Sequence, residues 1–254
     1  MIPEQYLELE HIYNATLAKG MRSLAVTSAN SGEGVSSVLA SLANRNLYAD
    51  RATLIVDFNL FRPNIRQRFS LPADTVSSSN TAITPYDNKQ LSNINIKQQL
   101  PPPHLITHSK SQAPLAVITP NPCKTTLLQL REPGTIEEMI ECWKKDYDSI
   151  LFDTSAINSA NWSNLPAPRA AAASDGALLV ILSGHTTETM LATATKKLTN
   201  AGAVIVGCVM NDRDNPQLNY ELIREANRIE GRFPRLSAWL KKKVRNTPIL
   251  NLEI

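Results

Sequence analysis

Short apolar runs alternate with longer amphipathic stretches along most of the chain. Several of these runs are apolar at nearly every position, which is typical of strands that are covered on both faces, as in a parallel sheet. Six runs have the length and the Val, Ile and Leu content of strands: residues 23–28, 52–58, 115–119, 149–154, 177–182 and 203–210. The pattern predicts an α/β fold with a mostly parallel central sheet.

Helical patterns lie between the apolar runs. We predict helices over residues 36–49, 135–147 and 186–202. Thr135 is followed three residues later by Glu138, which predicts a capping box at the start of the second helix. Gly202 closes the third helix with a residue typical of helix C-termini. Because strands and helices alternate, we expect helices on both faces of the sheet.

The 254 residues suffice for one large α/β domain, and we predict a single domain over residues 1–254. Residues 70–114 are rich in Ser, Asn, Pro and Gln and show no periodicity, which predicts a polar, flexible surface insertion with a short helix near residues 87–94. Residues 233–254 form a basic C-terminal segment that places Trp239 beside lysines. This segment is either a membrane-surface or partner contact, or a terminal helix that packs its tryptophan.

The overall charge excludes few classes of protein. A formal net charge of +3 and a pI of about 8.7 are too weakly basic to indicate nucleic-acid binding. The chain has three cysteines, an odd number, and they are widely spaced. We therefore expect Cys142 and Cys208 to be buried free thiols with no metal site. The first residues do not form a signal peptide, and no apolar run approaches the roughly 18 residues of a transmembrane helix. We therefore expect a cytoplasmic protein without a transmembrane segment.

The stretch TSANSGEGVSS, residues 27–37, has the layout of a phosphate-binding loop between a strand and a helix. Gly32 and Gly34 permit the turn, and Ser36 stands where a hydroxyl group would bind Mg²⁺. Val35, however, replaces the lysine of the pattern G-x-x-x-x-G-K-[ST]. An ammonium group about 4 Å from a phosphate oxygen contributes on the order of 4 kcal/mol. Its loss from the transition state would cost roughly three decades in rate.

Two carboxylates are predicted at strand ends beside this loop. Asp57 closes the strand of residues 52–58 and precedes Arg62-Pro63, and Asp153 closes another strand. An isolated aspartate at a strand end is usually a turn residue or a helix cap. Together with the loop, the two suit Mg²⁺ binding and the positioning of water.

With these segments, the chain resembles the bacterial tyrosine kinases of capsule and exopolysaccharide synthesis (BY-kinases), within the ParA/MinD class of P-loop proteins. The resemblance covers residues 20–215 except the insertion, and its most specific part is LIVDFNLFRPNIRQRF. It implies a P-loop NTPase-like fold, a partner resembling an inner-membrane polysaccharide co-polymerase, and ATP or ADP with Mg²⁺ as ligands. The implied nucleotide-binding residues are Gly32, Gly34, Ser36, Ser37 and Asn211, the last against adenine. Ser36, Asp57 and Asp153 would hold Mg²⁺, and the two aspartates would be catalytic in an active enzyme.

The departures from the family pattern point to a lost activity. Val35 replaces the loop lysine, Asn30 the second signature lysine, and Asn59 the second aspartate of the D-x-D motif. The arginines of the E-x-x-R-x-x-R ring motif are absent, which leaves homo-oligomerisation open, and Tyr220 alone follows Tyr147. We expect weakened nucleotide binding, no tyrosine kinase activity, and a scaffold or regulatory role, cytoplasmic or peripheral at the inner membrane. The alternatives are an active ATPase or autokinase with a rebuilt site, and a ParA/MinD-like positioning protein.

Overall fold

The computed structural model of the protein describes residues 7–60, 63–71, 100–106, 113–120, 124–159, 164–213, 218–228, 230–231 and 233–247. The described chain divides into two compact units. The first comprises Met1–Ile181 and Thr186–Asn211, and the second comprises Leu182–His185 and Asp212–Ile254. The single domain expected over residues 1–254 stays a prediction.

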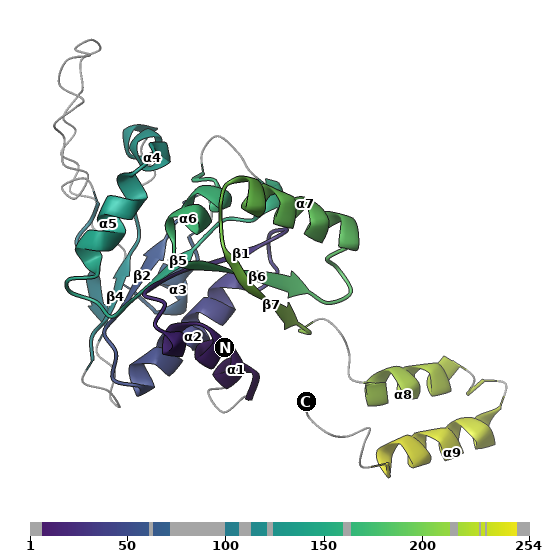
Figure 1. Cartoon of the computed structure of the whole chain (residues 1–254). Coiled ribbons are helices and arrows are strands. Elements are labelled where there is room, and N and C mark those ends of the chain that lie inside the picture. Colours follow the sequence, from purple (N-terminus) through teal and green to yellow (C-terminus); the bar gives the residue numbers. More distant parts are fainter. Residues whose placement is uncertain are drawn as a thin grey trace, which may run out of the picture. The chain divides into compact units, whose positions relative to one another are not determined.

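A seven-stranded sheet forms the centre of the first unit, in the order β3-β4-β2-β5-β1-β6-β7 (Figure 1). Its strands are β1 (Ser23–Ser28), β2 (Thr53–Asp57), β3 (His104–Ile106), β4 (Leu115–Ile118), β5 (Ser149–Asp153), β6 (Gly176–Leu182) and β7 (Ile205–Asn211). The β4, β2, β5, β1 and β6 pairings are parallel, and β3 is antiparallel to β4. All residues of β1, β2, β4 and β5 are buried, as the apolar runs predict.

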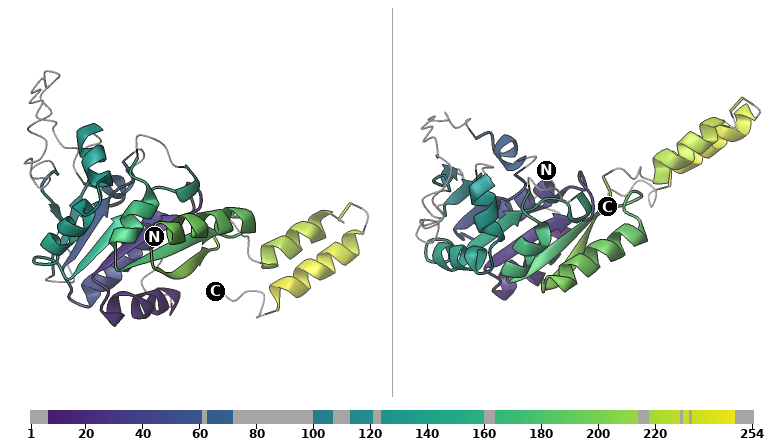
Figure 2. Two further views of the ribbon diagram at one scale, coloured as in Figure 1. Left: turned by 45° about the horizontal axis from the view of Figure 1, so that its top comes forward. Right: turned by 90° about the horizontal axis from the view of Figure 1, so that it is seen from above.

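Helices cover both faces of this sheet (Figures 1 and 2). One face carries α1 (Leu7–Ala15), α2 (Val35–Tyr48) and α3 (Ile65–Arg68), and the other carries α4 (Lys124–Arg131), α5 (Thr135–Trp143), α6 (Ala167–Ala173) and α7 (Glu188–Asn200). Along β2, Leu54 and Val56 pack on the second face and Ile55 on the first. This alternation places one sheet between two apolar cores, and the predicted α/β fold with a mostly parallel central sheet is confirmed.

The ends of the predicted helices are partly right. Gly202 lies just beyond α7 with a left-handed backbone (φ 83°), as its sequence position predicts. The capping box at Thr135 is wrong. Gly134 is the N-cap of α5, without a side-chain cap, and Thr135 is the first residue inside the helix. The glycine supplies the positive φ of 89° that this turn requires, so the chain enters the helix one residue earlier than the Thr-x-x-Glu spacing predicts.

The predicted insertion at residues 70–114 falls mostly outside the described residues, including the short helix expected near residues 87–94. Its described part departs from the prediction of an irregular segment, because β3 forms there. His104, Leu105 and Ile106 pair with β4 and extend the sheet by one antiparallel strand. Three residues are too few to show a period in the sequence. The pairing therefore depends on the neighbouring edge of the sheet.

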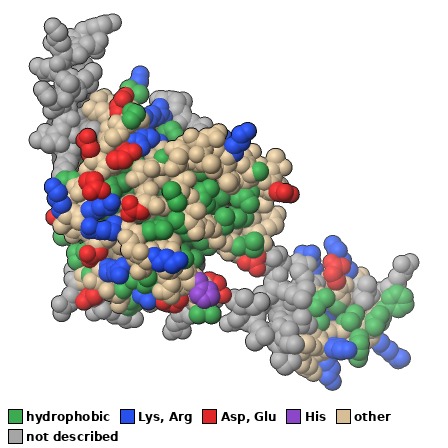
Figure 3. Space-filling view, in the orientation of Figure 1, with side chains coloured by type: hydrophobic (Ala, Val, Ile, Leu, Met, Phe, Trp, Pro, Cys, Tyr) green, Lys and Arg blue, Asp and Glu red, His purple; other side chains and the backbone are tan. Residues whose placement is uncertain are grey.

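The second unit contains α8 (Leu218–Arg228) and α9 (Pro234–Arg245), which pack on each other. Ser237 and Val244 of α9 are buried, whereas Leu236 and Trp239 are about half exposed. Hydrophobic and basic side chains lie together on the surface of this unit (Figure 3). The helical periodicity of the basic segment is thus confirmed. Within the described part of the chain, no helix is long and apolar enough to cross a membrane.

Candidate functional site

The loop between β1 and α2 has the geometry of a phosphate-binding turn. Gly32 and Gly34 have left-handed backbones, with φ of 86° and 104°. The carbonyl of Gly34 accepts hydrogen bonds from the N–H groups of Ser37 (2.9 Å) and Val38 (3.0 Å), so α2 begins directly after the turn. A Cβ atom on Gly34 would lie 2.5 Å from the amide nitrogen of Asn211. The backbone therefore favours glycine at position 34, and any side chain there would displace the Asn211 amide.

Val35 is the first residue of α2, and its side chain is 9% exposed. It belongs to the apolar core between α2 and the sheet, together with Val26 and Val38. At this position a conventional loop directs a lysine to the phosphates. Here the side chain contributes to the core instead, and it brings no charge to the turn.

Asp57 and Asp153 end neighbouring strands and are paired in the register of β2 and β5. Both are buried, at 1% and 0% exposure. One Asp57 oxygen accepts a hydrogen bond from the N–H of Asn59 (3.0 Å), and the other accepts one from the N–H of Ile65 (3.3 Å). Asp57 therefore also has the turn-and-cap role that is common at strand ends.

Asp153 connects the sheet to the loop. Its Oδ2 accepts a hydrogen bond of 2.6 Å from the hydroxyl of Ser36, whereas its Oδ1 is buried without a hydrogen-bond partner. Burial, and then the charge of Asp153, raise the pKa of Asp57 to about 8. Burial raises the pKa of Asp153 to about 7, although the Ser36 hydroxyl and the charge of Arg68 oppose this rise. The two carboxyls thus form a site that favours a bound proton or a cation.

The donor set suits Mg²⁺, which prefers oxygen ligands and keeps several waters. Ser36 and Asp153 present a hydroxyl and a carboxylate on the same side of the loop, and the unpartnered Oδ1 is free to accept a metal or its water. The Asp57 oxygens are already hydrogen-bonded to backbone N–H groups. Among the described residues, no group of three His, Cys, Asp or Glu side chains could bind a metal.

Glu33 is a buried loop residue that the sequence analysis missed. Its Oε1 accepts hydrogen bonds from the Asn30 amide (2.9 Å) and from the hydroxyl of Thr186 (2.6 Å). Its backbone carbonyl accepts one from the Asn211 amide (2.9 Å). Asn211 therefore lies against the loop, and its predicted contact with adenine stays a prediction. An acidic residue between two glycines usually indicates an exposed turn, and its burial depends on the distant residues 186 and 211.

Arg68 is the second residue that the sequence analysis missed. It ends α3, and its Nη2 donates a hydrogen bond of 2.6 Å to the hydroxyl of Ser37 on the first turn of α2. Arg62 and Arg66 precede it in the same segment of the chain. Arg62 lies outside the described residues. The arginine that reaches the loop is Arg68, which carries no pattern of its own in the sequence.

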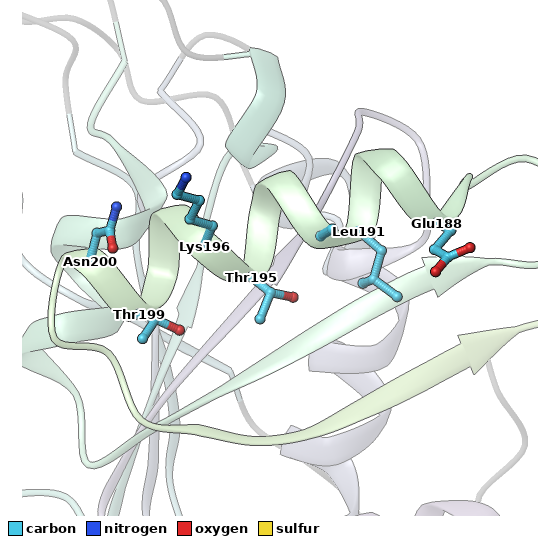
Figure 4. Close-up of a pocket in the computed structure, with 7 residues that line it drawn as sticks. Glu188, Leu191, Thr195, Lys196, Thr199 and Asn200 are labelled. Carbon is cyan, nitrogen blue, oxygen red and sulfur yellow. The ribbon is translucent and has the colours of Figure 1, made fainter.

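A cavity and the cysteines lie apart from this loop. A cavity of about 530 Å³ lies along α7, and all of its lining residues, among them Glu188, Leu191 and Lys196, come from that one helix (Figure 4). This cavity differs from the site at the loop, because its polar side chains do not point towards a common centre. Among the described residues, Cys142 and Cys208 form no disulfide, and neither is buried as predicted: Cys142 is half-buried and Cys208 is exposed. Cys208 lies on β7, an edge strand, and an apolar run does not reveal whether a strand has a covered face.

The strand-end carboxylates, the glycine turn and the parallel sheet define a protein of the P-loop NTPase class. Comparison with curated proteins shows relatives to which this chain is similar in sequence. It is 25% identical to the tyrosine-protein kinase YwqD of Bacillus subtilis over 211 residues, covering 83% of this chain and 81% of YwqD. It is 28% identical to the tyrosine-protein kinase CpsD of Streptococcus agalactiae over 197 residues, covering 76% of each chain. No family model matches the chain.

Solved structures give the same assignment of the fold. The kinase domain of the Escherichia coli tyrosine kinase ETK matches with a TM-score of 0.58 at 19% identity, over 82% of this chain and 74% of the other. The septum site-determining protein MinD of Pyrococcus horikoshii, complexed with Mg-ADP, matches with a TM-score of 0.51 at 18% identity, over 77% and 72%. The chain is thus a P-loop NTPase-fold protein whose sequence relatives are bacterial tyrosine kinases.

Proposed function

We propose that this chain is a BY-kinase-like protein of capsule or exopolysaccharide synthesis that has lost tyrosine kinase activity and acts as a scaffold or regulator. The observation that carries the proposal is the burial of Val35 in the core beneath the loop. Asn59 supports it, because a neutral amide stands where the family has its second acidic residue. ATP or ADP with Mg²⁺ binds weakly at the loop in this proposal, through Gly32, Gly34, Ser36, Ser37 and Asn211.

The electrostatics of the site explain why transfer would be slow. Phosphates bound at the loop would lie near the carboxyls of Asp57 and Asp153, and a cation at position 35 would normally offset the repulsion. A lysine ammonium at about 4 Å contributes on the order of 4 kcal/mol at a surface-like dielectric. If most of that contribution is made in the transition state, its absence costs roughly three decades in rate. The glycine turn does not depend on this charge, so its geometry persists without the activity.

Autophosphorylation tests the proposal directly. The purified chain is incubated with ATP and Mg²⁺ and analysed by phosphotyrosine immunoblotting and by mass spectrometry. We expect no phosphotyrosine. A Val35→Lys/Asn59→Asp double variant tests whether the two missing charges are the cause, and a gain of signal in this variant would support that cause. Phosphotyrosine in the wild type that disappears in Asp153→Asn would overturn the proposal.

An active ATPase with a rebuilt site is the second candidate. The hydrogen bond between Ser36 and Asp153 favours it, because these two groups keep the oxygen ligands that Mg²⁺ needs. Steady-state phosphate release from ATP distinguishes the two functions. Turnover that Asp153→Asn abolishes and that Asp146→Asn, a surface change of the same kind, leaves intact would favour the ATPase. Turnover that survives Asp153→Asn would exclude it.

The partner in this proposal is an inner-membrane polysaccharide co-polymerase-like protein, and the chain works at the membrane surface. The outer face of α9 supports a peripheral position. Trp239 and Leu236 are 54% and 47% exposed, and Lys243 lies 5.0 Å from the Trp239 ring. Aromatic and aliphatic side chains beside lysines are typical of helices that lie in the interface of anionic membranes.

Vesicle co-sedimentation tests the peripheral position. We expect binding to vesicles that contain phosphatidylglycerol, none to pure phosphatidylcholine, and a decrease as salt is raised. Trp239→Ala should reduce the bound fraction. Met210→Ala, which shortens an exposed apolar side chain of the first unit, should not. Equal binding to both vesicle types, or no effect of Trp239→Ala, would argue against this role of α9.

A further inference from the structure

The phosphate loop lacks a cation at both of the positions where its class has lysines. Val35 is buried in the core. Asn30 is neutral, and its amide donates hydrogen bonds to Glu33 Oε1 (2.9 Å) and to the Met190 sulfur (3.4 Å). Neither residue offers a positive charge to an anion over the loop. A phosphate group there must be bound by the backbone, by a metal or by another side chain.

A cation from another element does reach the loop. The two hydrogen bonds that connect Asp57 to Asn59 and Ile65 fold the chain back after β2, and the fully buried Ile65 anchors the short helix α3. From the end of α3, the half-buried Arg68 side chain extends to α2 and donates its 2.6 Å hydrogen bond to Ser37. Its charge also acts on Asp153. The guanidinium is therefore held beside the first turn of α2.

The surroundings of this guanidinium suit a phosphate that is bound together with a metal ion or its water, which the unpartnered Asp153 oxygen would accept. Asp153 is fully buried beneath the same helical turn, and its Oδ1 has no hydrogen-bond partner. The N-terminus of α2, a helix of 14 residues, adds the positive end of its dipole. A guanidinium has five N–H donors in a planar fork that matches phosphate oxygens, and the bond to Ser37 uses one of them.

We propose that Arg68 is the phosphate-binding cation of this loop and supplies from α3 the charge that position 35 lacks. The ligand is the phosphate chain of a nucleoside di- or triphosphate. This inference rests on the proposed retention of nucleotide binding at the loop. This role of Arg68 also explains how nucleotide binding persists without phosphoryl transfer. The positive charge comes from the side of Ser37, and position 35, where the lysine would stand, stays neutral.

The test is isothermal titration with ADP, ATP and adenosine in the presence of Mg²⁺. In Arg68→Gln we expect the affinity for ADP and ATP to fall roughly tenfold to a hundredfold, as for the loss of a hydrogen bond to a charged group. Adenosine, which has no phosphate, should bind both proteins alike. Arg68→Lys keeps the positive charge without the planar fork of N–H donors. Its affinity for ADP and ATP should lie between those of the wild type and Arg68→Gln. Arg228→Gln removes the same charge from an exposed position of the second unit and should bind like the wild type.

A rescue variant sharpens this test. Val35→Lys in the Arg68→Gln background restores a cation to the loop and should recover affinity for ADP. Unchanged ADP affinity in Arg68→Gln, or an equal loss for ADP and adenosine, would overturn the role of Arg68. A wild type that binds no ADP would overturn it together with the proposed nucleotide binding. Tyrosine phosphorylation of the wild type would overturn only the proposed loss of kinase activity, so the failures are distinguishable.

Discussion

Asp153→Asn probes the buried carboxyl pair most directly. The substitution replaces a fully buried carboxyl group with a neutral amide of nearly the same size. The amide oxygen can still accept the hydrogen bond from Ser36, so the packing of the loop is retained. What changes is the charge that the folded protein must hold at neutral pH. The variant therefore separates the electrostatic cost of the pair from its structural role.

The sign and size of the effect follow from the pKa of Asp153. Burial raises this pKa from an ordinary 3.8 to about 7 in the folded protein. The folded state then binds the proton more tightly than the unfolded state, so the contribution of this carboxyl to stability is fully present below about pH 4 and is lost as the pH rises through about 7. The difference corresponds to about 4 kcal/mol at 1.36 kcal/mol per pH unit. For a domain of this size, that is on the order of 10 °C in melting temperature.

The effect is measured by thermal unfolding at pH values between about 5 and 9, without added Mg²⁺. The wild type should lose stability as the pH rises. Asp153→Asn should be markedly more stable than the wild type at the alkaline end and flatten the profile, because it also removes the charge that raises the pKa of Asp57. Asp146→Asn makes the same chemical change on the surface and should follow the wild type. A wild-type profile that is flat, or that rises with pH, would refute the reasoning.

Two further predictions concern the loop and the core. Gly34→Ala should destabilise the protein more than Gly32→Ala: both incur the left-handed backbone cost of about 1–2 kcal/mol, but only the former meets a neighbour, the Asn211 amide at 2.5 Å. Equal losses in urea unfolding would show that the amide moves freely. Phe58→Ala should cost about 3–5 kcal/mol, since this fully buried ring stacks on Phe152 with centroids 5.2 Å apart. A loss below about 1 kcal/mol in the same assay would contradict the assigned core.

Most of the parallel sheet could be predicted from the sequence, because each strand carries its own signal. The run of residues 23–28 is β1 with the same bounds, and the runs that contain Asp57 and Asp153 end as strands at those aspartates. A strand buried on both faces is apolar at nearly every position, which a single sequence displays. The glycine turn was equally readable, since Gly32 and Gly34 adopt the left-handed backbone that favours glycine.

The sequence by itself thus determined the α/β class, the strands of the sheet other than β3, and the loop with its missing lysine. Only the tertiary structure decided which charges meet at that loop. Arg68 reaches Ser37 across 31 residues, and Thr186 reaches Glu33 across 153. Hydrophobic periodicity reports whether a residue faces a core, and it carries no information about which distant side chain a polar group will contact. That choice depends on how β2, α3 and the crossovers fold onto one edge of the sheet.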